Sequence, residues 1–285
     1  MKPSVKEASK NRLQVFLSHS GFCSRRKVME LIFAGHVSVN GRVIREPSTP
    51  VDPKQDKVSV NGKEIREEKL VYILLNKPKG VIATVKDEHA PQTVLDLLPK
   101  EFQHLYPVGR LDKDTEGLLL LTNDGDAAYR LTHPKFNVSK IYLVIVRGRL
   151  KDEDRKLLEK GITLEGELTL RRRPNSKMEG AAQCSNLKQA FRFSSRRAEG
   201  LTAPAKITNI KLSESKTEFL MSIHEGKKRQ IRLMLGSLKY PVLFLKRLQT
   251  GPLSLGKLPT GNWRFLTPEE ITAITQISHA QDKKK

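Results

Sequence analysis

The acidic side chains of residues 109–117 are the first groups in this sequence that could perform chemistry. Asp112, Asp114 and Glu116 crowd a short segment that begins at Gly109 and leads into an uninterrupted run of four leucines. A carboxylate in such a place can act as a nucleophile or as a general base, and it can equally serve as a turn or capping residue. Taken one at a time, these acids do not distinguish the two roles.

Strand and helix patterns surround this segment from residue 71 onward. Runs of β-branched and apolar residues predict strands, and apolar residues at helical spacing predict helices. The predicted strands are 71–75, 81–85, 117–122, 141–147, 207–213 and 217–223, and the predicted helices are 93–98, 125–131, 151–160, 227–238 and 268–275. Because the strands come in runs, we expect an α+β domain over 70–276, with a mixed, mostly antiparallel sheet and flanking helices.

A smaller domain is predicted ahead of this sheet, over residues 12–66. Apolar residues at helical spacing indicate one short helix near its start and a second helix that ends at Gly35. The triplet Val-Asn-Gly occurs at 39–41 and again at 60–62, and Asn-Gly between alternating apolar residues favours a tight hairpin turn. We therefore expect a compact helix-helix-hairpin domain.

The charge balance of the chain indicates a polyanionic partner. Lys and Arg number 52 against 31 Asp and Glu, which gives a formal net charge of +21 and a pI near 10.0. This surplus favours nucleic acid over a solvated basic surface. A membrane surface is the competing polyanion, but no apolar stretch approaches the roughly 18 residues of a spanning helix, and residues 1–12 lack the apolar run of a signal peptide. We expect a soluble, cytoplasmic monomer with a flexible lead-in at 1–11 and a disordered basic tail at 277–285.

The cysteines and histidines give no sign of a metal centre. Cys23 and Cys184 are far apart, and neither has a nearby Cys or His, so neither a disulfide framework nor a zinc site is indicated. No pair of histidines stands at helical ligand spacing, and no Gly-rich phosphate loop follows a strand. We expect no metal and no cofactor, so the chemistry must come from side chains.

The order of residues in the acidic segment narrows the alternatives. Residues 109–125 read G-R-L-D-K-D-T-E-G-L-L-L-L-T-N-D-G, which resembles the central motif of the RsuA-type pseudouridine synthases. Other motifs of that family lie on both sides of this segment and in family order. They are L-N-K-P-K-G at 75–80, K-I-Y at 140–142, E-G-K-K-R-Q-I-R at 225–232, L-K-R at 245–247 and G-P-L-S-L-G at 251–256. Residues 12–66 resemble the S4-like RNA-binding domain found ahead of this catalytic domain, so the resemblance covers nearly the whole chain.

This resemblance implies isomerisation of a specific uridine in ribosomal RNA without metal or cofactor. By resemblance Asp112 acts at the sugar, either as a nucleophile at the anomeric carbon or as a base that removes the neighbouring ribose proton, and both roles stay open. Arg232 matches the position whose guanidinium pairs with the catalytic aspartate, and Tyr142 matches the tyrosine that lies against the target base. Asp114 and Asp124 are interpreted as turn or capping residues.

The same chemistry places demands on RNA binding. A duplexed uridine cannot reach such a pocket, so the target is expected to be flipped out or drawn from a loop. Cations at the start of the second helix can bind phosphate through their charge and through free backbone donors, and Arg110 can hold the displaced nucleotide. The predicted RNA-binding residues are Arg25, Arg26, Lys27, Lys77, Arg110, Lys140, Arg229, Lys246 and Arg247.

The chain departs from the family pattern between Leu164 and Thr202, where it carries additional residues. Within 171–199 these are basic and interleaved with Phe191 and Phe193, which is typical of an RNA-clamping arm, and a disordered surface insertion is the alternative. Leu233 and Phe244 stand where relatives often carry cations. These losses put in doubt any transfer of the exact RNA site from relatives.

Two other functions compete with the enzyme. A non-catalytic ribosome-assembly factor could use the same fold to bind RNA, but the intact Asp112, Tyr142 and Arg232 argue against it. A simple S4-type RNA-binding protein would leave most of the chain unexplained. The segment 251–267 resembles members that modify the large ribosomal subunit, which makes that subunit the expected substrate.

Overall fold

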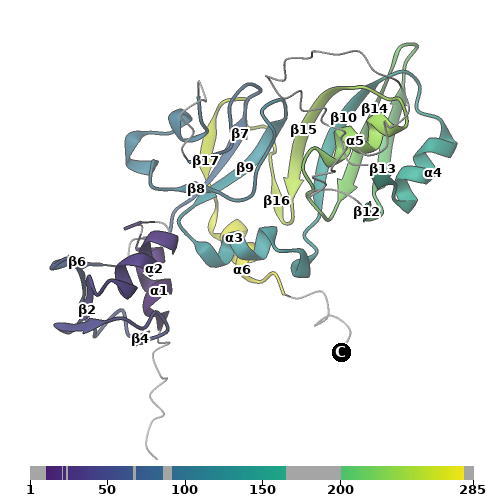
Figure 1. Ribbon diagram of the computed structural model, residues 1–285. Helices are drawn as coiled ribbons and strands as arrows, with labels where there is room; N and C mark the ends of the chain where they lie inside the picture. Colours follow the sequence, from purple (N-terminus) through teal and green to yellow (C-terminus); the bar gives the residue numbers. More distant parts are fainter. Residues whose placement is uncertain are drawn as a thin grey trace, which may run out of the picture. The chain divides into compact units, whose positions relative to one another are not determined.

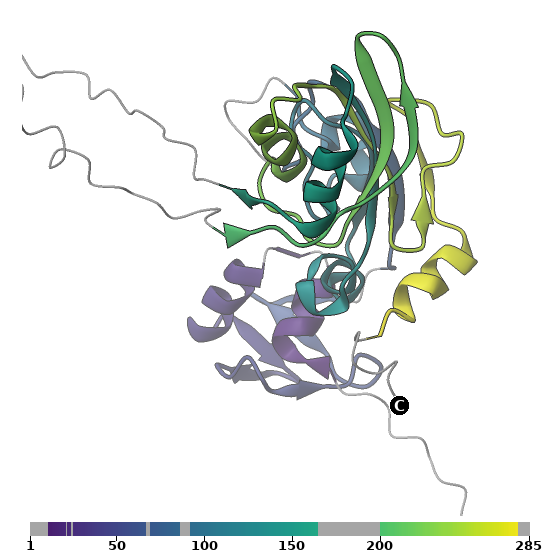
Figure 2. The same ribbon diagram turned by 90° about the vertical axis from the view of Figure 1, so that its right-hand side faces the viewer.

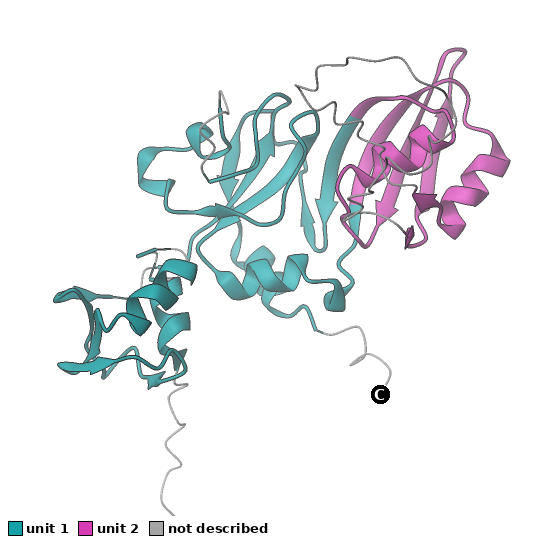
Figure 3. Ribbon diagram, viewed as in Figure 1, with its two compact units in different colours: residues 1–140, 245–285 teal, residues 141–244 magenta. Residues whose placement is uncertain are grey.

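The computed structural model describes residues 11–20, 22–23, 25–66, 69–85, 92–164 and 200–278. Most of the expected lead-in, the basic insertion 171–199 and nearly all of the tail lie outside these ranges. The described chain forms two compact units, one made of residues 1–140 and 245–285 and the other of residues 141–244 (Figure 3). The predicted catalytic segment 70–276 contributes to both units.

The N-terminal part of the first unit is the predicted helix-helix-hairpin domain. Helices α1 (Leu13–His19) and α2 (Arg25–Phe33) pack on the sheet β3-β2-β5-β6, and β1 (Asn11–Arg12) pairs with β4 (Pro50–Val51). The sheet strands are β2 (Val37–Val39), β3 (Arg42–Ile44), β5 (Val58–Val60) and β6 (Lys63–Ile65). Asn40 and Asn61 adopt φ values of 51° and 49°. These left-handed turn positions are the ones that Asn-Gly favours, so both predicted hairpins are confirmed.

The rest of the first unit is a mixed sheet of mostly antiparallel strands. Its order is β15 (Val242–Thr250), β9 (Glu116–Thr122), β7 (Tyr72–Lys77) and β17 (Trp263–Phe265), while β8 (Tyr106–Pro107) pairs with β9 and β16 (Leu253–Ser254) pairs with β15. Only the β15–β9 pairing is parallel among these. The predicted α+β class with a mixed, mostly antiparallel sheet is therefore confirmed.

Two helices cover one face of this sheet, α3 (Gly125–Thr132) and α6 (Pro268–Thr275) (Figure 1). Alternate residues of β7 and β9, such as Leu74 and Leu120, pack with Leu131 and Ile274 of the helices. Asp124 is the N-cap of α3, where its carboxylate accepts from the backbone N–H groups of Asp126 and Ala127 and from the Tyr72 hydroxyl at 2.6 Å. This matches its interpretation as a capping residue.

The second unit contains β10 (Lys140–Arg147), β14 (Lys216–Ile223) and β13 (Lys206–Leu212) as neighbouring strands. Residues of β14 alternate between buried and less buried positions, which is the pattern of a sheet covered on one face. Helices α4 (Asp152–Lys160) and α5 (Gln230–Ser237) lie on this face (Figure 2). The short strands β11 (Thr163–Leu164) and β12 (Gly200–Leu201) pair antiparallel at the two ends of the segment that contains the insertion.

Three predicted elements differ in the structure. Residues 81–85 form no strand and contribute only an isolated bridge between Ile82 and Thr93. The predicted helix 93–98 is a short 3-10 turn, η1 (Leu95–Leu97), and two more such turns are η2 (Lys100–Phe102) and η3 (Pro134–Phe136). The predicted helix 227–238 begins only at Gln230, because Arg229 has a left-handed φ of 53° that a continuing α-helix does not allow.

Candidate active site

The predicted catalytic residue Asp112 lies in a turn between β8 and β9. The backbone N–H of Thr115 donates to the Asp112 carbonyl at 3.0 Å, and the backbone N–H of Gly80 donates to the Lys113 carbonyl at 2.8 Å. Asp112 is partly buried, whereas the neighbouring Lys113 and Asp114 are exposed. The turn therefore presents one partly shielded carboxylate from a backbone that is fixed on both sides.

Lys77 lies beneath this turn, at the end of β7. Its ammonium donates to the carbonyls of Thr115 and Pro78 at 3.0 Å each and of Lys113 at 3.5 Å. Burial lowers the Lys77 pKa to about 8, and the nearby carboxylates of Glu116, Asp112 and Asp114 oppose this shift. Lys77 thus supplies a positive charge within electrostatic reach of Asp112.

The burial of Lys77 corrects the sequence prediction for it. The residue is 0% exposed, and its donors are directed at protein carbonyls, so it cannot contact RNA phosphate as predicted. The sequence motif N-K-P carries no signal of depth, because lysine is rarely buried and is read as a surface cation by default. Its position under the Asp112 turn instead indicates a role in holding that turn.

Arg247 of β15 also faces the interior. It is 5% exposed, and its Nε donates to the Leu118 carbonyl at 2.8 Å, so the prediction of direct RNA binding is wrong for this side chain as well. Its backbone is the parallel partner of Gly117 in β9. A Cβ on Gly117, which has φ 107°, would lie 2.2 Å from the Arg247 carbonyl oxygen, so this position requires glycine.

Lys140, Lys246 and Arg110 are predicted RNA-binding cations in the sheet-containing part of the first unit. Lys140 donates to the Val138 carbonyl at 3.0 Å, and burial together with the charge of Arg247 lowers its pKa to about 8. Lys246 donates to the Thr260 hydroxyl at 3.4 Å and keeps part of its side chain accessible, and Arg110 is exposed. Their accessibility is compatible with RNA contact, which stays a prediction.

The second unit carries the other predicted catalytic residues. Tyr142 lies on β10 and is 8% exposed. Arg232 is partly buried in the first turn of α5, where its guanidinium donates to the Val242 carbonyl at 3.4 Å. Arg229, just before the helix, is exposed. The pairing of Arg232 with Asp112 stays a prediction.

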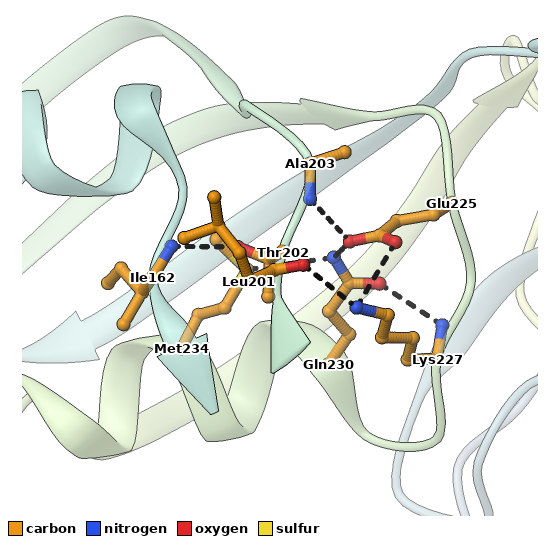
Figure 4. Close-up of polar contacts among 8 residues, drawn as sticks. All are labelled: Ile162, Leu201, Thr202, Ala203, Glu225, Lys227, Gln230 and Met234. Atoms are coloured by element: carbon orange, nitrogen blue, oxygen red, sulfur yellow. Dashed lines mark hydrogen bonds and ion pairs between the residues drawn. The ribbon is translucent and has the colours of Figure 1, made fainter. Parts of the chain in front are cut away.

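A carboxylate fixes the loop that leads into α5 (Figure 4). One oxygen of Glu225 accepts hydrogen bonds from the Gln230 side-chain amide at 2.6 Å and from the Ala203 backbone N–H at 2.8 Å. The Gln230 carbonyl oxygen in turn accepts from the Lys227 backbone N–H at 3.1 Å. We call Glu225, Lys227, Gln230 and Ala203 the Glu225 network.

The Glu225 network also connects this loop to the base of the insertion. The Lys227 ammonium donates to the Leu201 carbonyl at 3.1 Å and lies 3.5 Å from the second oxygen of Glu225. Across the β11–β12 pair, the Ile162 backbone N–H donates to the Thr202 hydroxyl at 2.9 Å (Figure 4). The loop that carries Arg229 and precedes Arg232 is therefore tied to the strand that leaves the insertion.

The structure brings together only some of the predicted residues. Lys77, Asp112, Lys140 and Arg247 belong to the first unit, where Lys77 is in electrostatic contact with Asp112 and Arg247, and Lys140 with Arg247. Arg26 and Lys27 are exposed at the start of α2, with Lys27 paired to Glu30 at 3.0 Å. The side chain of Arg25 is outside the described atoms. The roles of Glu225 and Gln230 were missed, although both belong to the quoted E-G-K-K-R-Q-I-R motif, because only its cations were interpreted.

The described ranges contain neither a metal centre nor a membrane-spanning helix. Among these residues, no group of three or more His, Cys, Asp or Glu side chains is arranged to hold a metal ion. In the same ranges, no helix has the length and apolar character needed to cross a membrane.

Comparison with known proteins gives a consistent assignment. A profile of the RNA pseudouridylate synthase family matches residues 71–237, and an S4-domain profile matches residues 11–56. The chain is 38% identical over 269 residues to ribosomal large subunit pseudouridine synthase B of Bacillus subtilis, covering 94% of this chain and 96% of the relative. It is 33% identical to an uncharacterized RNA pseudouridine synthase of Aquifex aeolicus, with coverage of 92% and 93%. A crystal structure of a pseudouridylate synthase aligns with a TM-score of 0.59 at 26% identity, covering 92% of this chain and 99% of that one.

These matches, the fold and the order of the sequence motifs define the class of enzyme. The chain belongs to the RNA pseudouridylate synthase family and carries an S4 domain at its N-terminus. It is an RNA pseudouridine synthase, an enzyme that isomerises uridine in RNA, which confirms the activity implied by the sequence resemblance.

Proposed function

We propose that this enzyme isomerises a specific uridine of ribosomal RNA, and that this RNA belongs to the large subunit. Two independent observations support the proposal. The Bacillus subtilis relative named as a large-subunit enzyme matches almost end to end, and residues 251–267 of this chain resemble members that modify the same subunit. The net charge of +21 suits a polyanionic substrate. A cytoplasmic monomer acting on free or pre-ribosomal RNA fits this function.

Asp112 is the proposed catalytic carboxylate. The reaction breaks the bond between N1 of uracil and C1′ of ribose, turns the base and forms a bond between C5 and C1′; C5 then loses its proton and N1 gains one, so the product is an isomer of uridine. Asp112 either attacks C1′ directly or removes the C2′ proton to give a glycal intermediate, and both roles need its ionised form. The single observation that carries this assignment is the fixed turn that presents Asp112 above the buried Lys77 ammonium.

Tyr142 and Arg232 complete the proposed site. The guanidinium of Arg232 pairs with Asp112 and favours its charged form, which desolvation by the bound base would otherwise penalise. Tyr142 stacks on the uracil and accepts or relays the C5 proton; such stacking contributes about 1–3 kcal/mol per base. The exposed cations Arg26, Lys27, Arg110 and Arg229 and the partly exposed Lys246 bind backbone phosphates, and Arg25 joins them at the start of α2.

The test is a modification map of ribosomal RNA. Carbodiimide treatment and reverse transcription would be applied to RNA from cells that lack the protein and are complemented with wild type or Asp112→Asn. The expected result is one stop in the large-subunit RNA that wild type restores and Asp112→Asn does not, while the purified variant keeps its RNA affinity. Restoration by Asp112→Asn would overturn the catalytic assignment. A map without any difference between strains would point instead to a substrate outside ribosomal RNA or to a non-catalytic assembly role.

A further inference from the structure

An exposed aromatic and basic surface lies at the C-terminal end of α3 and the start of η3. It consists of Tyr129, His133 and Lys135, which we call the Tyr129 surface. Tyr129 is 43% exposed, and His133 and Lys135 are also exposed. The neighbouring Leu131 and Phe136 belong to the hydrophobic core under α3. Leu131 and Phe136 therefore pack this segment against the core, and core packing does not explain the three exposed side chains.

Lys135 is positioned by rings rather than by a carboxylate. Its ammonium lies 4.6 Å from the centre of the Tyr129 ring and 4.8 Å from that of Phe136. No ion pair involves Lys135 within the part of the chain that the structure describes. A cation–π contact orients an ammonium without neutralising its charge, in contrast to a salt bridge. Lys135 therefore offers a fixed, unneutralised positive charge to solvent.

His133 adds a second donor at the same place. Its Nδ1 accepts a hydrogen bond from the Lys135 backbone N–H at 3.2 Å, and its ring lies 4.7 Å from the Tyr129 ring. A backbone N–H can only donate, so in this arrangement Nδ1 is unprotonated and the ring hydrogen resides on Nε2. An exposed imidazole N–H and an ammonium beside one aromatic ring are together suited to an anionic oxygen such as that of a phosphate.

The Tyr129 surface adjoins the segment that carries the proposed catalytic carboxylate. The methyl group of Thr132, at the end of α3, lies 3.5 Å from the position of a Cβ on Gly109. Gly109 begins the G-R-L-D motif and is three residues from Asp112, and its neighbour Arg110 is exposed. A strand of RNA that delivers a uridine to Asp112 would have its flanking backbone close to this end of α3.

We propose that the Tyr129 surface binds the ribosomal RNA backbone beside the target nucleotide, with Lys135 and His133 as phosphate ligands and Tyr129 as the ring that positions them. RNA is the occupant that the charges favour. Asp124 of this segment is buried and holds Tyr72 and the start of α3. The exposed Asp126 is offset by Arg130, which donates to the Ile277 carbonyl at 2.7 Å, so Lys135 is left as the surplus charge at the surface. The proposal rests on the RNA substrate of the enzyme and does not depend on which carboxylate performs the chemistry.

The first test compares Lys135→Gln with Lys156→Gln, which removes the same charge from an exposed position on α4. Lys156 follows the acidic first turn of α4, formed by residues 152–154, and is therefore a poor phosphate ligand. Affinity for an oligouridylate of about 12 nucleotides and turnover of a large-subunit RNA transcript would be measured over a series of salt concentrations. For Lys135→Gln we expect binding about three- to tenfold weaker, a salt slope smaller by about 0.7–0.9, a raised KM and an unchanged kcat. Lys156→Gln is expected to behave as wild type.

A second variant, Tyr129→Phe, keeps the ring under Lys135 and is expected to retain wild-type affinity, whereas Tyr129→Ala is expected to weaken binding as Lys135→Gln does. Equal effects of Lys135→Gln and Lys156→Gln would overturn the proposal, because only net charge would then matter. A loss of kcat at unchanged KM in Lys135→Gln would also overturn it and would indicate a disturbed Asp112 turn. If the wild-type enzyme does not modify the large-subunit transcript, the proposed substrate is contradicted. The oligouridylate affinities of the variants would then still test RNA binding by the Tyr129 surface.

Discussion

The two parts of the proposed site are anchored by charges of opposite sign. In the first unit the proposed catalytic carboxylate is presented by a turn whose Lys113 and Thr115 carbonyls accept from the buried Lys77 ammonium. In the second unit the proposed catalytic guanidinium is presented by helix α5, whose first residue, Gln230, donates its side-chain amide to the Glu225 carboxylate. Each anchor carries the charge opposite to the group that it positions. A buried charge can thus orient backbone groups and at the same time contribute a favourable field to the functional residue.

The largest effect on kcat is expected from removing one of the two proposed catalytic charges, the Arg232 guanidinium. Arg232→Met should reduce kcat by about 10²–10³-fold, because the ionised carboxylate would lose its fixed cation. Single-turnover rates and RNA affinity, both measured on the same large-subunit transcript, would separate the chemical step from binding. Arg232→Lys, which keeps charge but not the planar fork, is expected to be intermediate. Wild-type turnover by Arg232→Met would show that the Lys77 ammonium alone is enough to keep Asp112 ionised.

A smaller effect is expected from removing the cationic anchor. Lys77→Met should lower kcat by about 10–100-fold while leaving KM near its wild-type value, because the turn that presents Asp112 would loosen. The carbonyls left without a donor destabilise the fold by about 1–3 kcal/mol each, and the loss of a buried charge offsets part of this. Urea denaturation would measure the net change. An unaffected kcat would show that Lys77 does not position Asp112 for catalysis and that its role is structural.

Removing the acidic anchor, Glu225, is expected to lower kcat by about tenfold. Glu225→Ala removes the acceptor shared by Gln230 and Ala203, so the first turn of α5 should lose its fixed start and kcat should fall by about tenfold. Glu225→Gln keeps one acceptor oxygen and should recover part of this loss. The matched control is Glu218→Gln on β14, whose exposed pair with Lys211 at 3.5 Å is peripheral. Identical kinetics for Glu225→Ala and the control would contradict a positioning role.

The smallest expected effect concerns the pH dependence of stability. Burial lowers the pKa of Lys77 and of Lys140 to about 8, below the ordinary value of 10.5. Between these pH values the unfolded chain binds more protons than the folded chain, so the free energy of unfolding should rise with pH from about 8 to 10. Each lysine contributes a slope of at most about 1.4 kcal/mol per pH unit.

Chemical denaturation at closely spaced pH values would measure this slope. Lys77→Met should lower the slope by the contribution of one lysine. The double variant Lys77→Met with Lys140→Met should remove the slope between about pH 8 and 10. A slope that is the same in wild type and the double variant would show that neither lysine has a lowered pKa in the folded enzyme.

Local sequence signals predicted most of the elements but not all of their boundaries. The helix at 268–275 was predicted to the residue, because its capping box and N-terminal proline are local signals: Thr267 caps the helix and Glu270 returns the bond. The start of α5 was placed too early because the left-handed Arg229 and the Glu225 network depend on residues about 20 positions away. Strand β15 was missed because its polar and apolar residues follow no clean alternation.

The candidate site was predictable in its residues and less so in their roles. Motif order identified Asp112, Tyr142 and Arg232, because spacing along the chain survives in the sequence. Depth does not: Lys77 and Arg247 have side chains typical of a surface, and only the pairing of β7, β9 and β15 places them inside. The role of Glu225 was missed for a related reason, since its partner Ala203 lies 22 positions earlier and the motif spacing does not reveal that contact.

The β11–β12 pair makes this enzyme a natural scaffold for inserting other domains. Leu164 and Gly200 are register partners on neighbouring antiparallel strands, so the chain leaves and re-enters the second unit at almost one point. Closely spaced ends of this kind accept foreign segments with little loss of chain entropy, as in a hairpin whose loop is exchanged. A fluorescent or affinity module grafted between these residues would report on the enzyme in cells without a fusion at residue 1 or residue 285.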